Sequence, residues 1–354
     1  MVNIRLATEE DKEGWNRVAY ESPEATYAHT WEWKEVIEEG LGLESLYLVA
    51  EDKGEIMGIY PAFLRPKFEQ SKTREITHRL TNKFRVLWSP LDITWDYGGP
   101  CTIPGIDKAI LKNFVIAMEK HAKKHCVADI RVSPFYTHNY LTEILSINDY
   151  RVSSRLTSII DLAKSEEELW RGIKKNARRY INKPKREGVT VSERTNEVGL
   201  KNFYNCIQEL NKNSVEPIYI PSYLFYKSML DRLKPKNMIK IHNVVYDNEV
   251  IGGSISIYFK DIVTFRYAKI IGKYRDLHPH YLLHWVRIKE SKDLGYKYID
   301  LGGIPSDTNS GIYFFKTRWG GEIKNVDWYV KDIKFRKIKK IKRFLFTPHS
   351  AVYT

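Results

Sequence analysis

The sequence has little cysteine, three residues in 354, and it lacks any C-x-x-C pair. Cys101, Cys126 and Cys206 are odd in number and far apart, which is typical of reduced thiols and argues against a disulfide or zinc framework. No stretch approaches the ~18 apolar residues that span a bilayer. The first residues, MVNIRLATEEDKEGW, contain acids and no apolar run, so we expect no signal or transit peptide. These absences favour a cytoplasmic protein.

The sequence also lacks Pro-rich and Ser-rich tracts, whereas 43% of its residues are hydrophobic and 13% are aromatic. Such a composition is typical of a folded globular protein and excludes a disordered one. A length of 354 residues exceeds one ordinary domain. We therefore expect two domains of roughly 150 to 200 residues, each with a core of its own.

Positive charge is in excess, with a formal net charge of +13. This excess favours phosphate-bearing or otherwise acidic partners. Residues 331–343 hold eight basic side chains and one acid, and apolar residues alternate with them. The run 331–346 (KDIKFRKIKKIKRFLF) is predicted to be either a solvated segment or an amphipathic element for an RNA backbone or an anionic membrane surface. The same excess recurs in 171–186, which contains eight basic residues and no acid.

The two halves of the chain repeat one pattern. Residues 47–58 (YLVAEDKGEIMG) and 244–252 (VVYDNEVIG) each predict a strand, an acidic turn, a second strand and a glycine. Each hairpin is followed by apolar residues at helical spacing, at 110–124 and 282–294, and then by a short strand, at 129–132 and 298–301. The halves are therefore predicted to be copies of one α/β unit, with a boundary near residue 151.

The second half begins with a predicted strand at 156–162. Ser165, with Glu168 three residues later, has the spacing of a capping box and predicts the start of a helix, which Pro184 and Gly188 are expected to end. A strand at 189–192 and helices at 197–211 and 223–233 follow. In the predicted strand 250–258, the pair Gly252-Gly253 indicates a β-bulge or a place where a ligand lies against the backbone, and we favour the bulge.

The most informative stretch is 298–322, where a strand ends in Asp300 and Gly302-Gly303 follow. Lys316 comes downstream between Phe314-Phe315 and Trp319. A glycine pair lets a backbone approach a ligand closely, and a lysine among aromatic residues is a candidate for binding a developing negative charge. The alternatives are a surface lysine whose stem lies on Trp319 and an aspartate that only caps its own turn.

On the helix predicted after Ser165, five basic residues recur at spacings of three and four, so they share one broad face. Such a face suits phosphates, and arginine is the better residue for bidentate contact. A merely solvated charged face is the alternative interpretation. The five residues are Arg171, Lys174, Lys175, Arg178 and Arg179.

Three passages carry a resemblance to a known family: SIIDL (158–162) with the basic segment 166–189, YLLHW (281–285) with YIDLGG (298–303), and GIYFFKTRWGG (311–321). Weaker echoes are TWEWK (30–34) and DYGGP (96–100). The chain resembles the Fem aminoacyltransferases, which build peptidoglycan interpeptide bridges, and the wider FemAB-like branch of the GNAT acyltransferase superfamily. The resemblance implies an α/β fold (α+β, mixed sheet) of two GNAT-like domains in tandem without a coiled-coil arm. We expect these domains at 1–150 and 151–335, with a basic tail at 336–354.

The resemblance also implies roles for residues. Lys316 and Phe315 match the family's reaction centre, where the lysine stabilises the oxyanion and the phenylalanine shapes a dry pocket. Arg178 and Arg179 match basic positions near a nucleotide-linked muropeptide, and Lys34 is expected to bind the same ligand. The site is completed by Asp300, which would orient the acceptor amine, serve as base or only cap its turn, and by Gly302, Gly303 and Trp319. We expect no metal, because His278, His280 and His284 have no cysteine or carboxylate at ligand spacing.

The donor stays open at this point. Residues 270–279 lack the glycine-rich loop that holds the coenzyme A pyrophosphate in ordinary acetyltransferases, which disfavours but does not exclude acyl-CoA. The resemblance favours aminoacyl-tRNA as donor and a phosphate-bearing acceptor, a nucleotide- or lipid-linked muropeptide or sugar. No bound cofactor is expected, and the protein would be cytoplasmic or peripheral at the inner membrane face. The alternatives are an acyl-CoA-dependent N-acyltransferase acting on an amino sugar or peptide, and a non-catalytic RNA-binding protein.

Overall fold

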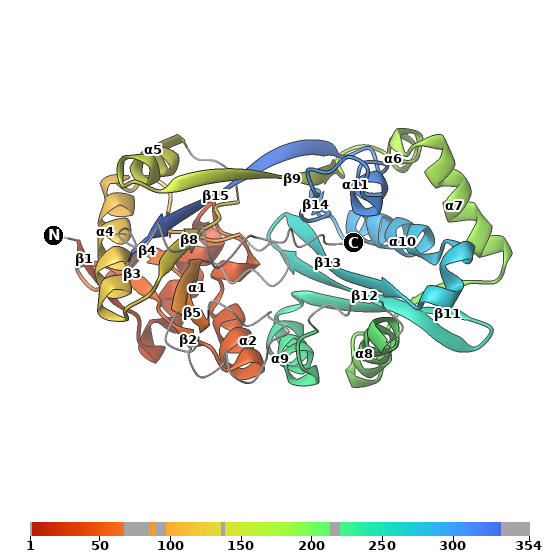
Figure 1. Ribbon diagram of the computed structural model, residues 1–354, viewed down its shortest axis with the longest axis horizontal. Coiled ribbons are helices and arrows are strands. Elements are labelled where there is room, and N and C mark those ends of the chain that lie inside the picture. The colour runs from red at the N-terminus through yellow and green to blue at the C-terminus, as the bar shows by residue number, and fades with distance from the viewer. Residues whose placement is uncertain (1, 67–84, 90–96, 136–138, 213–219, 334–354) are drawn as a thin grey trace, which may run out of the picture. The chain divides into compact units, whose positions relative to one another are not determined.

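The computed structural model of the protein describes residues 2–66, 85–89, 97–135, 139–212 and 220–333, and it divides into two units (Figure 1). Unit 1 comprises the described parts of 1–34, 43–155 and 326–354, and unit 2 comprises 35–42 and the described parts of 156–325. Helix α2 (Trp31–Leu41) and strands β9 (Arg151–Asp161) and β15 (Glu322–Asp332) contribute residues to both. The boundaries expected at 150 and 335 stay predictions, and the basic tail at 336–354 lies outside the described residues.

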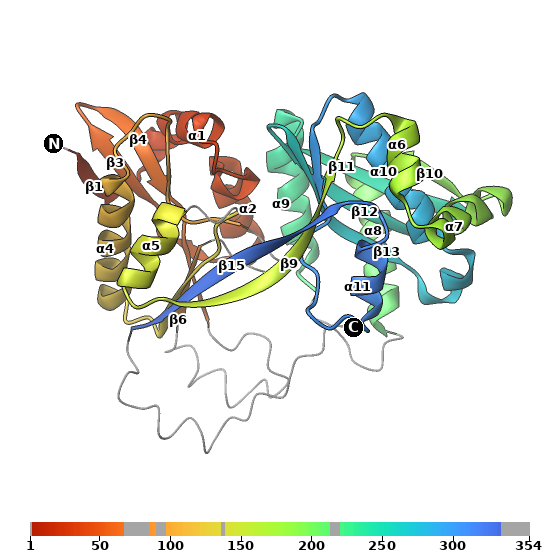
Figure 2. The ribbon, with the colours of Figure 1, turned by 90° about the horizontal axis from the view of Figure 1, so that it is seen from above.

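Unit 1 is built on two groups of strands. One has the antiparallel order β1-β3-β4-β7, and the other has the order β15-β8-β6-β5-β2, in which β6 and β8 are parallel. Helices α4 and α5 lie side by side and bury their apolar faces in one core (Figures 1 and 2). The elements are β1 (Asn3–Leu6), α1 (Lys12–Glu21), β2 (Glu44–Ser45), β3 (Leu48–Asp52), β4 (Glu55–Tyr60), β5 (Phe63–Pro66), β6 (Arg85–Ser89), β7 (Cys101–Thr102), α4 (Ala109–Lys124), β8 (Asp129–Val132) and α5 (Asn139–Ile147).

Unit 2 is a mixed sheet in the order β10-β11-β12-β13-β14-β9, with helices on both faces. Only β13 and β14 pair in parallel. Helices α7 and α10 cover one face, and α8 and α9 cover the other (Figure 1). The elements are α6 (Glu166–Gly172), α7 (Lys175–Arg186), β10 (Thr190–Glu193), α8 (Glu197–Lys212), α9 (Tyr223–Leu233), β11 (Ile239–Tyr246), β12 (Glu249–Phe259), β13 (Ile262–Ile270), α10 (Pro279–Asp293), β14 (Tyr298–Asp300) and α11 (Gly311–Lys316).

This layering confirms the predicted α/β class with a mixed sheet. In the described part of unit 2, no pair of long helices forms a coiled-coil arm. The repeated pattern found in the sequence is also confirmed, because β3-β4 and β11-β12 are antiparallel hairpins and each is followed along the chain by a long helix, α4 or α10, and a short strand, β8 or β14.

A β-bulge occupies the same place in both hairpins. The register of β3 with β4 shifts so that Met57 is unpaired, and the register of β11 with β12 shifts so that Ile251 is unpaired. Each bulged residue directly precedes a glycine, Gly58 or Gly252. A Cβ on Gly252 would lie 2.6 Å from the backbone oxygen of Lys269 on the next strand. The bulge predicted at the glycine pair is therefore confirmed, and it lets the neighbouring strand approach closely.

The helix predicted after Ser165 is interrupted, so the expectation of one broad basic face is wrong. Helix α6 ends at Gly172, and α7 begins after Lys174, whose N–H donates to the Arg318 carbonyl at 3.0 Å. The break lets the backbone of Gly172 meet Gly320, where an added Cβ would lie 2.9 Å from it. Pro184 does not end α7 but lies in its last turn, and the chain leaves the helix at Gly188 with a positive φ.

Candidate active site

The site is built where two parallel strands part. β13 and β14 pair through 262–264 and 298–300, and beyond them the register of β13 with β12 shifts between Phe265 and Tyr267. Asp300 ends β14 and is wholly buried. Its Oδ1 accepts hydrogen bonds from the Thr157 hydroxyl at 2.5 Å and from the Gly302 N–H at 2.8 Å. Asp300 thus caps the turn that follows it, as one of its predicted roles requires.

The glycine turn, Gly302-Gly303, receives the ammonium of Lys316. Lys316 is the last residue of α11, and its Nζ donates to the Gly303 carbonyl at 2.8 Å. Gly302 has φ +74°, and a Cβ added there would lie 3.5 Å from Nζ. The ammonium therefore lies against the turn, and a glycine at 302 leaves one side of it uncrowded.

Desolvation governs the charge on Lys316. Burial of the ammonium lowers the pKa of Lys316 to about 8, and the negative charge of Asp300 opposes this shift without cancelling it. At neutral pH the side chain is still mostly cationic. A cation in such a dry place interacts strongly with any negative charge that forms beside it.

Aromatic rings pack together on both sides of Lys316 in the sequence. Phe315 lies edge-on to His284 with ring centroids 4.7 Å apart, and the buried Trp319 stacks on His284 at 5.4 Å and on Tyr281 at 5.8 Å. We call these four residues the aromatic wall. It joins α10 to α11 and to the residues just after α11.

The basic residues of α7 lie apart from this wall. Arg178 donates to the Trp170 carbonyl at 3.5 Å, whereas Arg179 is exposed. In the described residues neither arginine contacts Lys316. Helix α7 is joined to the wall instead by Tyr180, whose ring lies 5.1 Å from that of Tyr281. The phosphate-binding role of the two arginines stays a prediction.

Lys34 belongs to unit 1. Its Nζ forms an ion pair with Glu9 at 3.0 Å and lies 4.5 Å from the Trp31 ring centroid, and the residue is 8% exposed. The predicted contact of Lys34 with a ligand is not tested by this geometry. The structure brings Asp300, Gly302, Gly303, Phe315, Lys316 and Trp319 together, and their roles stay predictions. The sequence analysis did not include Thr157, Tyr281 or the place of His284 in the wall.

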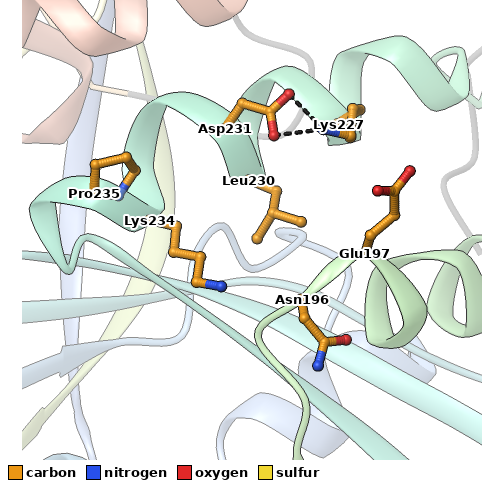
Figure 3. Close-up of a pocket in the computed structure, with 7 residues that line it drawn as sticks. All are labelled: Asn196, Glu197, Lys227, Leu230, Asp231, Lys234 and Pro235. Carbon is orange, nitrogen blue, oxygen red and sulfur yellow. Dashed lines mark hydrogen bonds and ion pairs between the residues drawn. The ribbon is translucent and has the colours of Figure 1, made fainter.

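One cavity lies elsewhere in unit 2, between the start of α8 and the end of α9 (Figure 3). Lys227 and Asp231 form an ion pair at its rim, 2.5 Å apart. It contains none of the candidate site residues. Its lining is Asn196, Glu197, Lys227, Leu230, Asp231, Lys234 and Pro235.

The described residues include neither a metal-binding cluster nor a membrane-spanning helix. They contain no cluster of three or more His, Cys, Asp or Glu side chains placed to hold a metal ion. Their helices include none with the length and apolar character needed to cross a membrane.

Comparisons with known proteins agree with this architecture. A structure of FemX is similar with a TM-score of 0.67 at 12% identity, covering 92% of this chain and 96% of that one. A tandem GNAT protein from the clavulanic acid biosynthesis pathway has a TM-score of 0.60 at 9% identity, covering 94% and 99%. The C-terminal domain of a putative lysylphosphatidylglycerol synthetase from Agrobacterium fabrum has a TM-score of 0.58 at 11% identity, covering 91% and 92%. At these identities the likeness shows a shared fold.

A sequence comparison locates the family signal. No curated protein matches the chain. The sequence profile of the FemAB family matches residues 234–343, a stretch that includes α10, the glycine turn and Lys316. Residues 234–343 therefore resemble the FemAB family, and the chain as a whole shares the fold of FemX and of the tandem GNAT protein.

Proposed function

We propose that the chain transfers an aminoacyl or acyl group from an activated donor to an amine. The observation that carries the proposal is Lys316, whose desolvated ammonium is held against the glycine turn at 2.8 Å from the Gly303 carbonyl. Attack of an amine on an ester or thioester carbonyl creates a tetrahedral oxyanion. A preorganised cation beside that oxygen stabilises the transition state by about 3 to 4 kcal/mol.

In this proposal the amine attacks the donor directly, without a covalent enzyme intermediate. Cys206 is the cysteine of unit 2, and burial raises the pKa of its thiol to about 12, so its thiolate is scarce at neutral pH. Asp300 is wholly buried and holds the turn. Its carboxylate lies near Lys316 and interacts with the ammonium, which favours a role in positioning the turn and the lysine.

We favour aminoacyl-tRNA as donor and a phosphate-bearing muropeptide, lipid or sugar as acceptor. The FemAB match and the excess of positive charge support this choice. One structural relative is named as a putative lysylphosphatidylglycerol synthetase, and lysylphosphatidylglycerol is a phospholipid. The segment before α10 lacks a glycine-rich phosphate loop, which disfavours coenzyme A. A cytoplasmic protein, peripheral at the inner membrane face through its basic tail, fits such substrates.

The test measures transfer by purified protein from two donor classes. Radiolabelled aminoacyl-tRNA or acyl-CoA would be incubated with a nucleotide-linked muropeptide, and the label in the acceptor counted. We expect transfer from aminoacyl-tRNA and a loss of about 10²-fold or more in Lys316→Met. Transfer from acyl-CoA alone would select the N-acyltransferase alternative, for which an amino sugar and a peptide serve as further acceptors.

The non-catalytic RNA-binding alternative makes the opposite prediction. It requires salt-dependent tRNA binding that is unchanged in Lys316→Met, with no transfer from any donor. The comparisons offer no support for it, and the dry position of Lys316 has no use in a protein that only binds an RNA backbone.

A further inference from the structure

His284 lies in the aromatic wall with a fixed ring orientation. Its Nδ1 is 3.0 Å from the carbonyl of His280, one turn earlier in α10. A carbonyl oxygen only accepts hydrogen bonds, so Nδ1 is the protonated nitrogen of the neutral ring and Nε2 carries the lone pair. The hydrogen bond within the helix therefore fixes the tautomer.

Three rings hold the imidazole in place. Trp319 stacks on it with an interplanar angle of 26°, and Phe315 and Phe265 meet it edge-on with centroids at 4.7 and 5.5 Å. The residue is 7% exposed. Some fully enclosed nitrogen and oxygen atoms lack a hydrogen-bond partner, and Nε2 is not one of them. Within the described chain no hydrogen bond reaches Nε2. It is an acceptor that a substrate or a water can approach.

The charges around His284 keep the ring neutral. Burial, the charges of Arg287 and His280 on its own helix, and the charge of Lys316 on α11 lower the pKa of His284 well below its usual value. Arg287 is wholly buried, lies 3.6 Å from the Phe265 centroid and donates to the Ser256 hydroxyl at 2.9 Å. A fixed cation thus lies on one side of His284 and the candidate catalytic lysine on another.

The proposed reaction needs a proton acceptor at this place. An amine that has attacked a carbonyl carries a surplus proton, and the acceptor of that proton has to meet the nitrogen. Asp300 cannot meet it, because the carboxylate is wholly buried beneath the glycine turn. His284 combines an accessible lone pair with proximity to Lys316.

We propose that His284 Nε2 accepts the proton that the acceptor amine loses during transfer, which makes it a catalytic residue of the function proposed above, on which this inference rests. The amine nitrogen bonds to the carbonyl carbon, and the carbonyl electron pair moves to the oxygen beside Lys316. The nitrogen's proton passes to Nε2. When the intermediate collapses, the bond from carbon to the leaving oxygen breaks, and the imidazolium returns the proton to that oxygen. The nearby cations favour this return because they destabilise the imidazolium.

The first test examines the ring without any turnover. In protein labelled with ¹⁵N-histidine, we expect the His284 resonances, assigned by their loss in His284→Asn, to report a neutral ring with a proton on Nδ1 at pH 7. Lys316→Met removes one facing cation while Arg287 and His280 remain, so the pKa of His284 should rise in that variant. A ring protonated on Nε2 would overturn the proposal.

The second test separates the two ring nitrogens. His284→Asn places an amide nitrogen near Nδ1 and leaves nothing at Nε2, whereas His284→Gln extends an amide towards Nε2. Neither accepts a proton, so we expect both to lower kcat by about 10²- to 10⁴-fold. His278→Asn is the matched control, because asparagine tolerates its φ of +57° and the His278 ring contacts the ring of Tyr281, at 6.2 Å, and not that of His284.

The outcomes distinguish this inference from the proposed function. If wild type transfers and His284→Asn transfers equally fast, the inference is wrong and the function stands. Full activity in His284→Gln alone would reduce His284 to a hydrogen-bonding role and also overturn it. If wild type transfers from neither donor class, the proposed function fails, and the inference fails with it.

Discussion

Burial disfavours the charged form of Lys316, and this effect makes the folding stability depend on pH in a direction that can be measured. The pKa of about 8 in the folded protein lies below the value of about 10.4 expected for an unfolded lysine. Between these values the unfolded chain binds more protons, so folding stability contributed by this group rises with pH from about 8 to about 10.4. Below pH 8 the folded state carries the full cost of the buried charge.

Lys316→Met should therefore be more stable than wild type at pH 7, by about 1 to 3 kcal/mol in the free energy of unfolding, because it removes a desolvated charge. The excess should shrink when the pH is raised from 7 to 9.5, where wild type gains stability and the variant does not. Urea unfolding at both pH values measures it. A difference that stays constant with pH would contradict a depressed lysine pKa.

A second prediction at this scale concerns the side of Lys316 that Gly302 leaves open. Gly302→Ala forces a side chain into φ +74° and places its Cβ 3.5 Å from Nζ. We expect a loss of about 1 kcal/mol in stability and a fall in transfer of 10-fold or more, since the methyl group crowds the oxyanion position. Transfer assays and thermal unfolding of the same preparations separate the two effects.

Gly295→Ala is the control for backbone strain. Gly295 has φ +83°, and a methyl group added there would have nothing within 4 Å, so its variant should lose similar stability and keep its activity. Equal losses of activity in both variants would show that backbone strain alone impairs the enzyme.

Single residues of the site differ in how far the sequence revealed them. Asp300, Gly302 and Lys316 are found from sequence because one short segment carries them all, and local turn chemistry fixes two of the three. Thr157 donates to Asp300 from 143 residues away, and no local pattern predicts that pairing. His284 is visible in the sequence, but its ring partners come from β13, from α11 and from the residues after α11, so its surroundings appear only in the fold.

At the scale of elements, the paired bulges explain a glycine that propensity alone would count as a defect. Gly252 lies beside the bulged residue of β12, where a Cβ would meet Ile270 Cδ1 at 2.3 Å and the Lys269 carbonyl at 2.6 Å. The second contact is with backbone and cannot be relieved by a rotamer change. Strand β13 can approach only because no side chain is present.

Gly252→Ala should therefore lose about 2 to 4 kcal/mol in the free energy of unfolding, because two strands have to move apart. Gly272→Ala, at an open position with no positive φ, should change it by less than about 0.5 kcal/mol. Denaturant titration of both variants measures the difference. A tolerated alanine at 252 would mean that the strands are not held at this spacing.

The break between α6 and α7 shows why the predicted basic helix was wrong. The capping box at Ser165 is present, with Glu168 donating its N–H to the serine hydroxyl, so the start of the helix followed from local chemistry. Its end did not. The chain leaves the helix at Gly172 to meet Gly320, a contact between segments almost 150 residues apart in sequence. Long-range packing overrides helical spacing at such a point.

At the scale of the whole molecule, the units are not contiguous in sequence. Residues 35–42 belong to unit 2 although they precede most of unit 1. Arg232 on α9 forms ion pairs with Glu35 and Glu39, and a Cβ on Gly40 would lie 2.6 Å from the backbone of Phe225. The second half of the sequence therefore depends on a segment of the first.

A fragment of residues 151–333 should consequently be less stable than the same fragment with residues 31–42 joined ahead of it through a flexible linker. We expect a difference of several degrees in Tm, since the short fragment exposes the α9 surface that this segment covers. Thermal unfolding of the two fragments measures it, and both lack the same parts of unit 1. Equal Tm values would show that 35–42 adds nothing to unit 2.

Strand β15 affects the order in which the two units can fold during translation. Tyr329, 1% exposed, lies in the apolar core of unit 1 with residues from α4 and α5, yet the ribosome makes it after all of unit 2. After residue 155, the core of unit 1 still lacks β15 while about 170 further residues are translated. The usual order, in which an N-terminal domain folds before its successor appears, is closed to this protein. The core of unit 1 is therefore complete only after all of unit 2 has been translated.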